Sequence, residues 1–204
     1  MSGGVQFLMK KNKIDVLMGT GKVKVGKKVD VTDDKGKTTE YSAKNIVLAT
    51  GARSRHLPNL PQDGVNIIGY RDAMVLPKMP KKMVVVGSGA IGVEFAYFYQ
   101  TMGCEVTVVE YMPNIVPVED EEVSKQLERS FKKQGIKIMT NSSVESVDTS
   151  GKGCKVKVQT KKGEEILECD VVLSAVGIET NIENIGLEEV GIVTDKGKVL
   201  VNDF

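Results

Sequence analysis

The segment Met83–Gly92, read Met-Val-Val-Val-Gly-Ser-Gly-Ala-Ile-Gly, decides the fold. A short apolar run ends in three glycines with the spacing G-x-G-x-x-G, and a helix-compatible apolar segment follows. A second apolar run, Val106–Val109, ends at an acidic residue, Glu110, which lies 23 residues after Gly87. Strand, glycine turn, helix, strand and acid in this order form the full fingerprint of a dinucleotide-binding unit. The sequence therefore predicts a dinucleotide site at this turn.

Each part of the fingerprint has a physical task. Gly87 permits the tight turn, Gly89 lets the backbone approach a pyrophosphate, and Gly92 lets the helix pack closely on the strand. The N–H groups at the start of the helix favour the phosphate charge. Glu110 is expected to accept hydrogen bonds from the adenosine ribose diol. Because a 2′-phosphate would be repelled by the Glu110 carboxylate, the sequence favours NAD over NADP.

Composition and charge narrow the class of protein. The 204 residues are 41% hydrophobic and 27% charged, with a net charge of +1, as in globular proteins that are soluble. Residues 1–82 carry sixteen Lys and Arg against seven Asp and Glu, whereas residues 83–204 carry twelve against twenty. The basic residues are scattered without aromatic residues between them, so we expect two solvated surfaces and no nucleic-acid binding. No segment has the ~18 apolar residues of a membrane span, and no signal peptide is evident, so we expect a cytoplasmic protein.

Cysteine and histidine usage argues against a metal centre or a general base in this chain. Cys104, Cys154 and Cys169 are far apart, with no C-x-x-C spacing, which predicts reduced structural thiols. The only histidine, His56, lies in an Arg- and Pro-containing stretch that predicts an exposed loop. The acidic run 119–122 resembles a metal site at first sight. The start of a helix suffices to explain it and is the interpretation we prefer.

Strand and helix patterns surround the central segment. Before it, we expect a strand at 14–18, a small β-meander between Val23 and Tyr41, and a buried-type strand, Asn45–Ala49, that ends in Thr50-Gly51-Ala52. After it, we expect a helix at 119–134. The remaining expected elements are a strand at 136–139, a second meander at 144–168, a strand at 170–175 ending in Val176-Gly177, and a strand pair within 191–201. The order predicts an α/β protein with a Rossmann-like parallel sheet and a β-meander excursion.

Three strand ends together carry a family resemblance. They are Leu48-Ala-Thr-Gly51, Val86-Gly-Ser-Gly-Ala-Ile-Gly92 and Ser174-Ala-Val-Gly177, in this order along the chain. The pattern resembles the flavin-dependent pyridine-nucleotide disulfide oxidoreductases, and within them the dihydrolipoyl dehydrogenases. Further support comes from Gly19-Thr-Gly21, Arg53, Leu57-Pro58 and the segment Asn184–Glu188. The resemblance covers nearly all of the 204 residues.

The resemblance implies a domain plan. It implies a partial FAD-binding domain at 1–71, an NAD-binding domain at 72–190, and at 191–204 the truncated start of a return to the FAD-binding domain. The expected fold class is thus α/β, with the Rossmann-like NAD-binding domain flanked by partial FAD-domain segments.

The resemblance also implies the residues that contact cofactors. On the NAD side they are Gly87, Gly89, Ala90, Ile91, Gly92, Glu94, Glu110, Val144, Val176 and Gly177. On the FAD side they are Gly21, Thr50, Gly51 and Ala52. Val144 is expected against the adenine, and Glu94 near the contact between flavin and nicotinamide, although an exposed helix position explains Glu94 as well. Ile178 departs from the pattern, since many relatives have Arg there.

The activity implied is that of a longer parent enzyme, of which this chain is expected to be a piece. The family's first glycine fingerprint, its C-x-x-x-x-C redox pair and its His–Glu pair do not occur in this sequence, so no catalytic residue is expected here. The parent would oxidise the lipoyl-bearing component of a 2-oxo-acid dehydrogenase complex, as a homodimer, with FAD and NAD. Two alternatives remain: a mercuric- or glutathione-reductase type, which usually takes NADPH, and a non-enzymatic NAD-sensing module.

Overall fold

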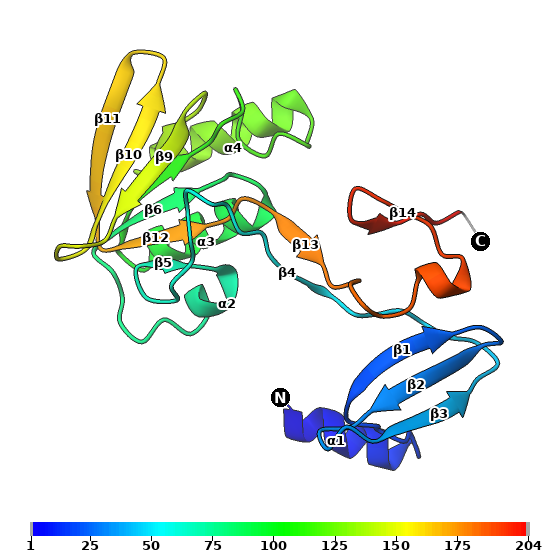
Figure 1. The fold of residues 1–204 in the computed structure, drawn as a ribbon. Helices are drawn as coiled ribbons and strands as arrows, with labels where there is room; N and C mark the ends of the chain where they lie inside the picture. The colour runs from blue at the N-terminus through cyan, green and yellow to red at the C-terminus, as the bar shows by residue number, and fades with distance from the viewer. Residues whose placement is uncertain (1, 203–204) are drawn as a thin grey trace. The chain divides into compact units, whose positions relative to one another are not determined.

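The computed structural model describes residues 2–202 as an α/β protein (Figure 1). It divides into two compact units, which we treat separately. Unit 1 comprises Met1–Ala52 and Thr180–Phe204, and unit 2 comprises Arg53–Glu179. No helix among residues 2–202 is long and apolar enough to cross a membrane.

Unit 2 is built on a five-stranded, all-parallel sheet with the strand order β5-β12-β6-β7-β8. Its strands are β5 (Ile67–Ile68), β12 (Val171–Ser174), β6 (Lys82–Val86), β7 (Glu105–Val109) and β8 (Lys137–Met139). The helices of this unit are α2 (Tyr70–Ala73), α3 (Ala90–Thr101) and α4 (Glu121–Lys133). The helix expected at 119–134 is confirmed, and the Asp120 carboxylate caps it by accepting a hydrogen bond from the Glu122 N–H at 2.8 Å.

Both faces of the parallel sheet are covered, which explains the unbroken apolar run of β6. Met83 and Val85 face a core that includes Tyr99 of α3 and Phe131 of α4. Val84 and Val86 face a second core on the opposite side of the sheet. That side is covered by the antiparallel meander of β9 (Ser143–Asp148), β10 (Cys154–Thr160) and β11 (Gly163–Cys169). The predicted Rossmann-like sheet with a β-meander excursion is therefore confirmed.

Unit 1 contains helix α1 (Ser2–Lys11) and an antiparallel three-stranded sheet. The strands are β1 (Thr20–Lys24), β2 (Lys28–Thr32) and β3 (Thr38–Ser42), which confirms the first meander. The later segment supplies the short helix η1 (Glu188–Val190) and the hairpin of β14 (Thr194–Asp195) with β15 (Lys198–Val199). The chain leaves unit 1 in β4 (Ala52–Ser54) and returns to it in β13 (Ile178–Thr180), and these two strands pair.

Two strands expected in unit 1 are wrong. Residues 14–18 and 45–49 form neither helix nor strand, and Val47 remains 85% exposed. A buried strand needs neighbours for its backbone and its apolar side chains, and among residues 2–202 no strand pairs with either segment. Thr50-Gly51-Ala52 therefore follows irregular chain instead of ending a strand.

The compact units divide the chain at 52/53 and 179/180, and the predicted domain limits 71/72 and 190/191 stay predictions. The first division precedes β6 by about 30 residues because the segment before β6 belongs to the core of unit 2. Leu60 and Ile67 are 1% and 3% exposed and contribute to the core beneath the meander. The assignment of the predicted domains to particular cofactors stays a prediction.

Candidate cofactor site

A cleft of about 860 Å³ lies in unit 2 at the carboxyl ends of β12, β6 and β7. These three strands are neighbours in the sheet, so the turns that follow them lie side by side. The position is the one at which open α/β sheets bind their ligands, and the volume suits a small organic cofactor. The residues lining it are Arg55, Leu57, Asn59, Leu60, Val86–Ile91, Val109–Tyr111, Pro117, Val118, Ser142–Val144 and Ala175–Ile178.

The glycine turn between β6 and α3 forms the floor of the cleft. Gly87 has a φ of +95°, and a Cβ there would lie 2.4 Å from the Ala175 carbonyl oxygen. A Cβ at Gly92 would lie 2.0 Å from the Gly87 carbonyl oxygen, so the helix packs directly on the turn. By contrast, a Cβ at Gly89 would meet nothing within 4 Å. Two glycines are thus needed for packing, and Gly89 keeps open the space at the N-terminus of α3, where a phosphate fits best.

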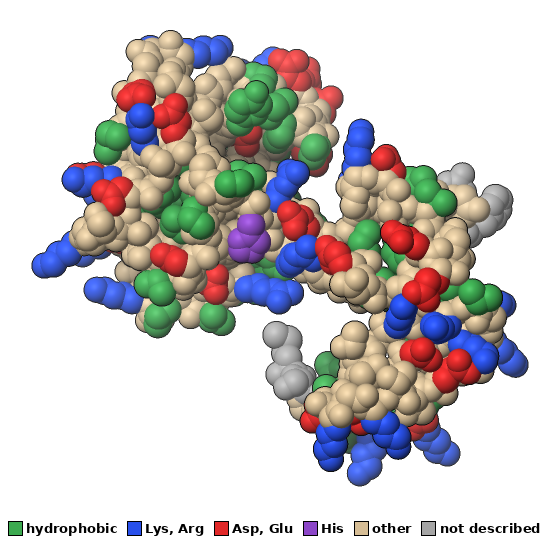
Figure 2. Space-filling model, viewed as in Figure 1, with side chains coloured by type: hydrophobic (Ala, Val, Ile, Leu, Met, Phe, Trp, Pro, Cys, Tyr) green, Lys and Arg blue, Asp and Glu red, His purple; other side chains and the backbone are tan. Residues whose placement is uncertain are grey.

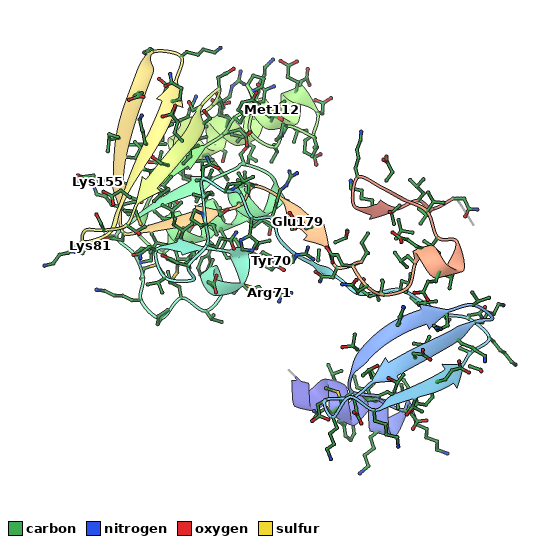
Figure 3. All side chains as sticks on the ribbon, in the orientation of Figure 1. Tyr70, Arg71, Lys81, Met112, Lys155 and Glu179 are labelled. Atoms are coloured by element: carbon green, nitrogen blue, oxygen red, sulfur yellow. The ribbon has the colours of Figure 1, made fainter. Side chains whose placement is uncertain are left out.

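Glu110, directly after β7, is buried at 7% exposure and is held by three hydrogen bonds. Its Oε2 accepts from the backbone N–H of Ser88 at 2.8 Å and from the Ser88 hydroxyl at 2.6 Å. Its Oε1 accepts from the Met112 N–H at 2.8 Å; Met112 lies in the loop between β7 and α4 (Figure 3). The carboxylate is therefore fixed against the glycine turn and cannot swing freely.

The loop between β7 and α4 forms one wall of the cleft. The Val116 N–H donates to the Ser88 carbonyl oxygen at 3.0 Å, which ties this wall to the glycine turn. Val116 adopts a φ of +41°, an uncommon conformation for a β-branched residue. Such backbone persists only where the surroundings hold it in place. Pro117 and Val118 follow it as lining residues.

The segment 55–60 also contributes residues to the lining of the cleft. The Arg55 N–H donates to the Gly177 carbonyl oxygen at 3.0 Å, which sets Arg55 beside the end of β12. The Asn59 amide donates to the Val144 carbonyl oxygen at 2.8 Å, which joins this segment to β9. Among the described residues that line the cleft, Arg55 is the only Lys or Arg, and Glu110 is the only Asp or Glu.

The structure brings together eight of the ten residues predicted for the NAD side. Gly87, Gly89, Ala90, Ile91, Glu110, Val144, Val176 and Gly177 all line the cleft. Gly92 lies beneath it as a packing residue. Glu94 is exposed on α3 and does not line the cleft, so the structure gives no geometric support to its predicted role.

The four residues predicted for the FAD side lie in unit 1. Gly21 is on β1 opposite Val31, and Ala52 begins β4. The carbonyl oxygens of Thr50 and Gly51 accept hydrogen bonds from Asn181, at 3.1 and 3.0 Å. None of the four lines the cleft described above.

Sequence reasoning missed Ser88 and the segment 55–60. Ser88 lies between two glycines of the fingerprint, and a polar side chain at that position in the sequence indicates a residue of the site. Arg55 and Asn59 offered no such signal, because long-range hydrogen bonds to Gly177 and Val144 bring them to the cleft.

Other chemistry-bearing residues lie outside the cleft. The single histidine, His56, is at the surface as predicted (Figure 2). All three cysteines are buried free thiols. Within residues 2–202, no group of three or more His, Cys, Asp or Glu is placed to hold a metal ion.

Unit 2 has a Rossmann-type α/β fold, with the cleft at the carboxyl ends of its central parallel strands. Over residues 1–204 the sequence matches the family described as pyridine nucleotide-disulphide oxidoreductase, and the chain belongs to this family. It is 40% identical to a dihydrolipoyl dehydrogenase of Zymomonas mobilis and 42% identical to one of Rhizobium etli. Each match covers 100% of this chain but only 44% and 46% of those proteins, so the chain spans less than half their length.

Solved structures agree with this assignment. LpdA of Mycobacterium tuberculosis superimposes with a TM-score of 0.84 at 31% identity, covering 96% of this chain and 43% of that one. The HOCl-induced flavoprotein disulfide reductase RclA of Escherichia coli, as its Cu(II) complex, gives a TM-score of 0.77 at 26% identity, covering 97% and 46%.

Proposed function

We propose that the cleft of unit 2 binds NAD(H). The observation that carries this proposal is the meeting, in one cleft, of the open glycine turn and the fixed Glu110 carboxylate. Gly89 leaves room for a pyrophosphate at the start of α3, and Glu110 lies one strand away, where the adenosine ribose would lie. Gly177, on the other side of β6, lies where the nicotinamide half would extend.

The residues of this chain would bind and orient the cofactor. The α3 N-terminus and Arg55 would hold the pyrophosphate charge, and Val144 and Val118 offer apolar surface in the same cleft as Glu110. When bound, NAD⁺ would supply the hydride acceptor, and the protein's own contribution is position and electrostatics.

We further propose that the whole protein is a dihydrolipoyl dehydrogenase. The similarity to the Zymomonas, Rhizobium and Pisum sativum enzymes supports this proposal, the last at 39% identity. It would oxidise the lipoyl-bearing component of a 2-oxo-acid dehydrogenase complex and work as a homodimer. Gly21, Thr50, Gly51 and Ala52 would belong to its FAD-binding part, with 1–71 and 191–204 as portions of that domain and 72–190 as the NAD-binding domain.

Titration of the 204-residue chain with NADH and with NADPH tests the binding proposal. We expect NADH to bind weakly and more tightly than NADPH, because the carboxylate of Glu110 repels a 2′-phosphate. We also expect no retained flavin and no turnover of dihydrolipoamide by this chain alone. Tighter binding of NADPH would favour the mercuric- or glutathione-reductase alternative.

The NAD-sensing alternative predicts a different result of NADH binding. A sensor would couple NADH binding to a change in association with another molecule and would need no flavin partner domain. Sequencing the full reading frame distinguishes the two: a C-x-x-x-x-C pair upstream supports the dehydrogenase, and its absence supports the sensor.

A further inference from the structure

We propose that Ser88 is a positioning residue that sets the preference for the adenosine 2′-hydroxyl by holding Glu110. The proposal rests on the proposed binding of NAD(H). Its basis is the short buried contact between the Ser88 hydroxyl, 0% exposed, and the Glu110 carboxylate. The Ser88 hydroxyl is not explained by the glycine fingerprint, which needs no side chain between its first two glycines.

Ser88 occupies two of the hydrogen-bond acceptor sites of the Glu110 carboxylate. A carboxylate has about four lone-pair sites. Ser88 fills two of those on Oε2 through its N–H and its hydroxyl, and the Met112 N–H fills one on Oε1. One acceptor site remains, on Oε1. Glu110 therefore offers the ribose diol one hydrogen bond without breaking any that the structure shows.

The same contacts hold the Glu110 carboxylate in the position from which it repels a 2′-phosphate. Rotating the carboxylate away from an approaching phosphate would break three charge-assisted hydrogen bonds in this chain, but only two in a chain without the Ser88 hydroxyl. Removing the Ser88 hydroxyl leaves Oε2 with the backbone N–H alone. We expect this freer carboxylate to bind a ribose hydroxyl less well and to tolerate a 2′-phosphate better.

The test compares three ligands on the full 204-residue chain: NADH, 2′-deoxy-NADH and NADPH. For Ser88→Ala we expect NADH affinity to fall about three- to tenfold, in the lower part of the range of coupling between residues in one hydrogen-bond network. The affinity for 2′-deoxy-NADH should stay within about twofold, since this ligand lacks the hydroxyl in question. The preference for NADH over NADPH should fall accordingly. If all three ligands lose affinity equally, Ser88 has only a structural role and the proposal is wrong.

Ser174→Ala is the matched control. Ser174 is also a buried serine of unit 2, at 4% exposure, and its hydroxyl has no hydrogen-bond partner among residues 2–202. Its removal should leave all three affinities unchanged. A change of ligand preference in this variant would mean that any lost buried hydroxyl near the sheet alters the site, which contradicts the proposal.

A double-mutant comparison protects the test against misfolding and against failure of the proposed function. In a Glu110→Gln background, Ser88→Ala should no longer change the preference between NADH and 2′-deoxy-NADH. A remaining effect would show that Ser88 acts without Glu110. Failure of the unsubstituted chain to bind NADH at all would overturn both proposals. Normal NADH binding with an unaltered Ser88→Ala preference would overturn only this one.

Discussion

The two units of this chain make opposite use of their apolar residues. In unit 2, apolar strands are covered on both faces, and Val85, Val106 and Leu173 are at most 1% exposed. In unit 1, the only buried residue among those described is Leu187, while Phe7 is 64% and Val47 is 85% exposed. The difference teaches that an apolar pattern predicts burial only where the fold supplies a covering layer.

Unit 2 therefore has what unit 1 lacks, namely a core closed by its own elements. In the proposed parent enzyme, the exposed apolar residues of unit 1 would be covered by further parts of an FAD-binding domain. The stability of the chain should accordingly reside in unit 2, and the following predictions test that contrast.

Truncating a phenylalanine in each unit should give the largest contrast. Phe131 of α4 is 4% exposed in the core of unit 2, so Phe131→Ala should lower the free energy of unfolding by about 3–5 kcal/mol. Phe7→Ala removes an exposed ring of α1 and should change it by less than about 0.5 kcal/mol. Urea unfolding followed by circular dichroism and tyrosine fluorescence measures both. A comparable loss in Phe7→Ala would show that α1 is packed in solution.

Replacing a left-handed glycine in each unit should give the next contrast. At Gly26, in the β1–β2 turn, a Cβ would meet nothing within 4 Å, so Gly26→Ala should cost only the backbone strain of about 1–2 kcal/mol. At Gly87 the Cβ would also clash with the Ala175 carbonyl, so Gly87→Ala should cost about 3 kcal/mol. It should also weaken NADH binding more than tenfold, whereas Gly26→Ala should leave binding unchanged. Equal effects of the two variants on NADH affinity would contradict the proposal that NADH binds at the Gly87 turn.

The contrast also explains how much of the fold could be predicted. The run Met83–Val86 and the segment Asn45–Ala49 have similar apolar character, yet only the first forms a strand. Alternating residues of β6 pack against α3 and α4 on one face of the sheet and against the β9–β11 meander on the other. Residues 45–49 have no such layers. The apolar pattern of each segment could be seen in the sequence, but the presence of the layers that cover it could not.

The residues of the candidate site also fall into those that local sequence predicts and those that depend on tertiary contacts. Gly87, Gly89 and Glu110 could be predicted because turn chemistry and strand ends are local properties of the sequence. The Ser88–Glu110 contact and the approach of Arg55 are tertiary and span many residues. The helix that contains Glu94 was predicted correctly, and its side chain is exposed outside the lining of the cleft, so its role near the flavin and nicotinamide stays a prediction.

High pH should destabilise unit 2 in particular, because it holds all three cysteines. Burial raises the pKa of Cys104 to about 11 and that of Cys169 to about 12, from an ordinary 9.0. The unfolded chain therefore releases these protons first. Stability is fully present below pH 9 and is lost as the pH rises through 11 to 12. At pH 10 each thiol should lower the free energy of unfolding by roughly 1 kcal/mol.

Urea unfolding between pH 7.5 and pH 10 measures this loss. Cys169→Ala should flatten the dependence on pH, since one of the two strongly shifted thiols is gone. An unchanged slope in that variant would mean that the Cys169 thiol is not protected in the folded state.

The smallest expected effect concerns Arg55, the only Lys or Arg among the described residues that line the cleft. Because a pyrophosphate brings two negative charges and a helix N-terminus only about half a positive one, Arg55→Gln should weaken NADH binding. We expect about a three- to tenfold loss at low salt, and a weaker dependence of the dissociation constant on ionic strength. Arg129→Gln on α4 and Lys44→Gln in unit 1 remove exposed cations outside the cleft and should leave binding unchanged. Equal affinity in all three variants would show that backbone N–H groups alone hold the pyrophosphate. A loss in Lys44→Gln would instead show that unit 1 takes part in binding NADH, which would end the contrast between the units.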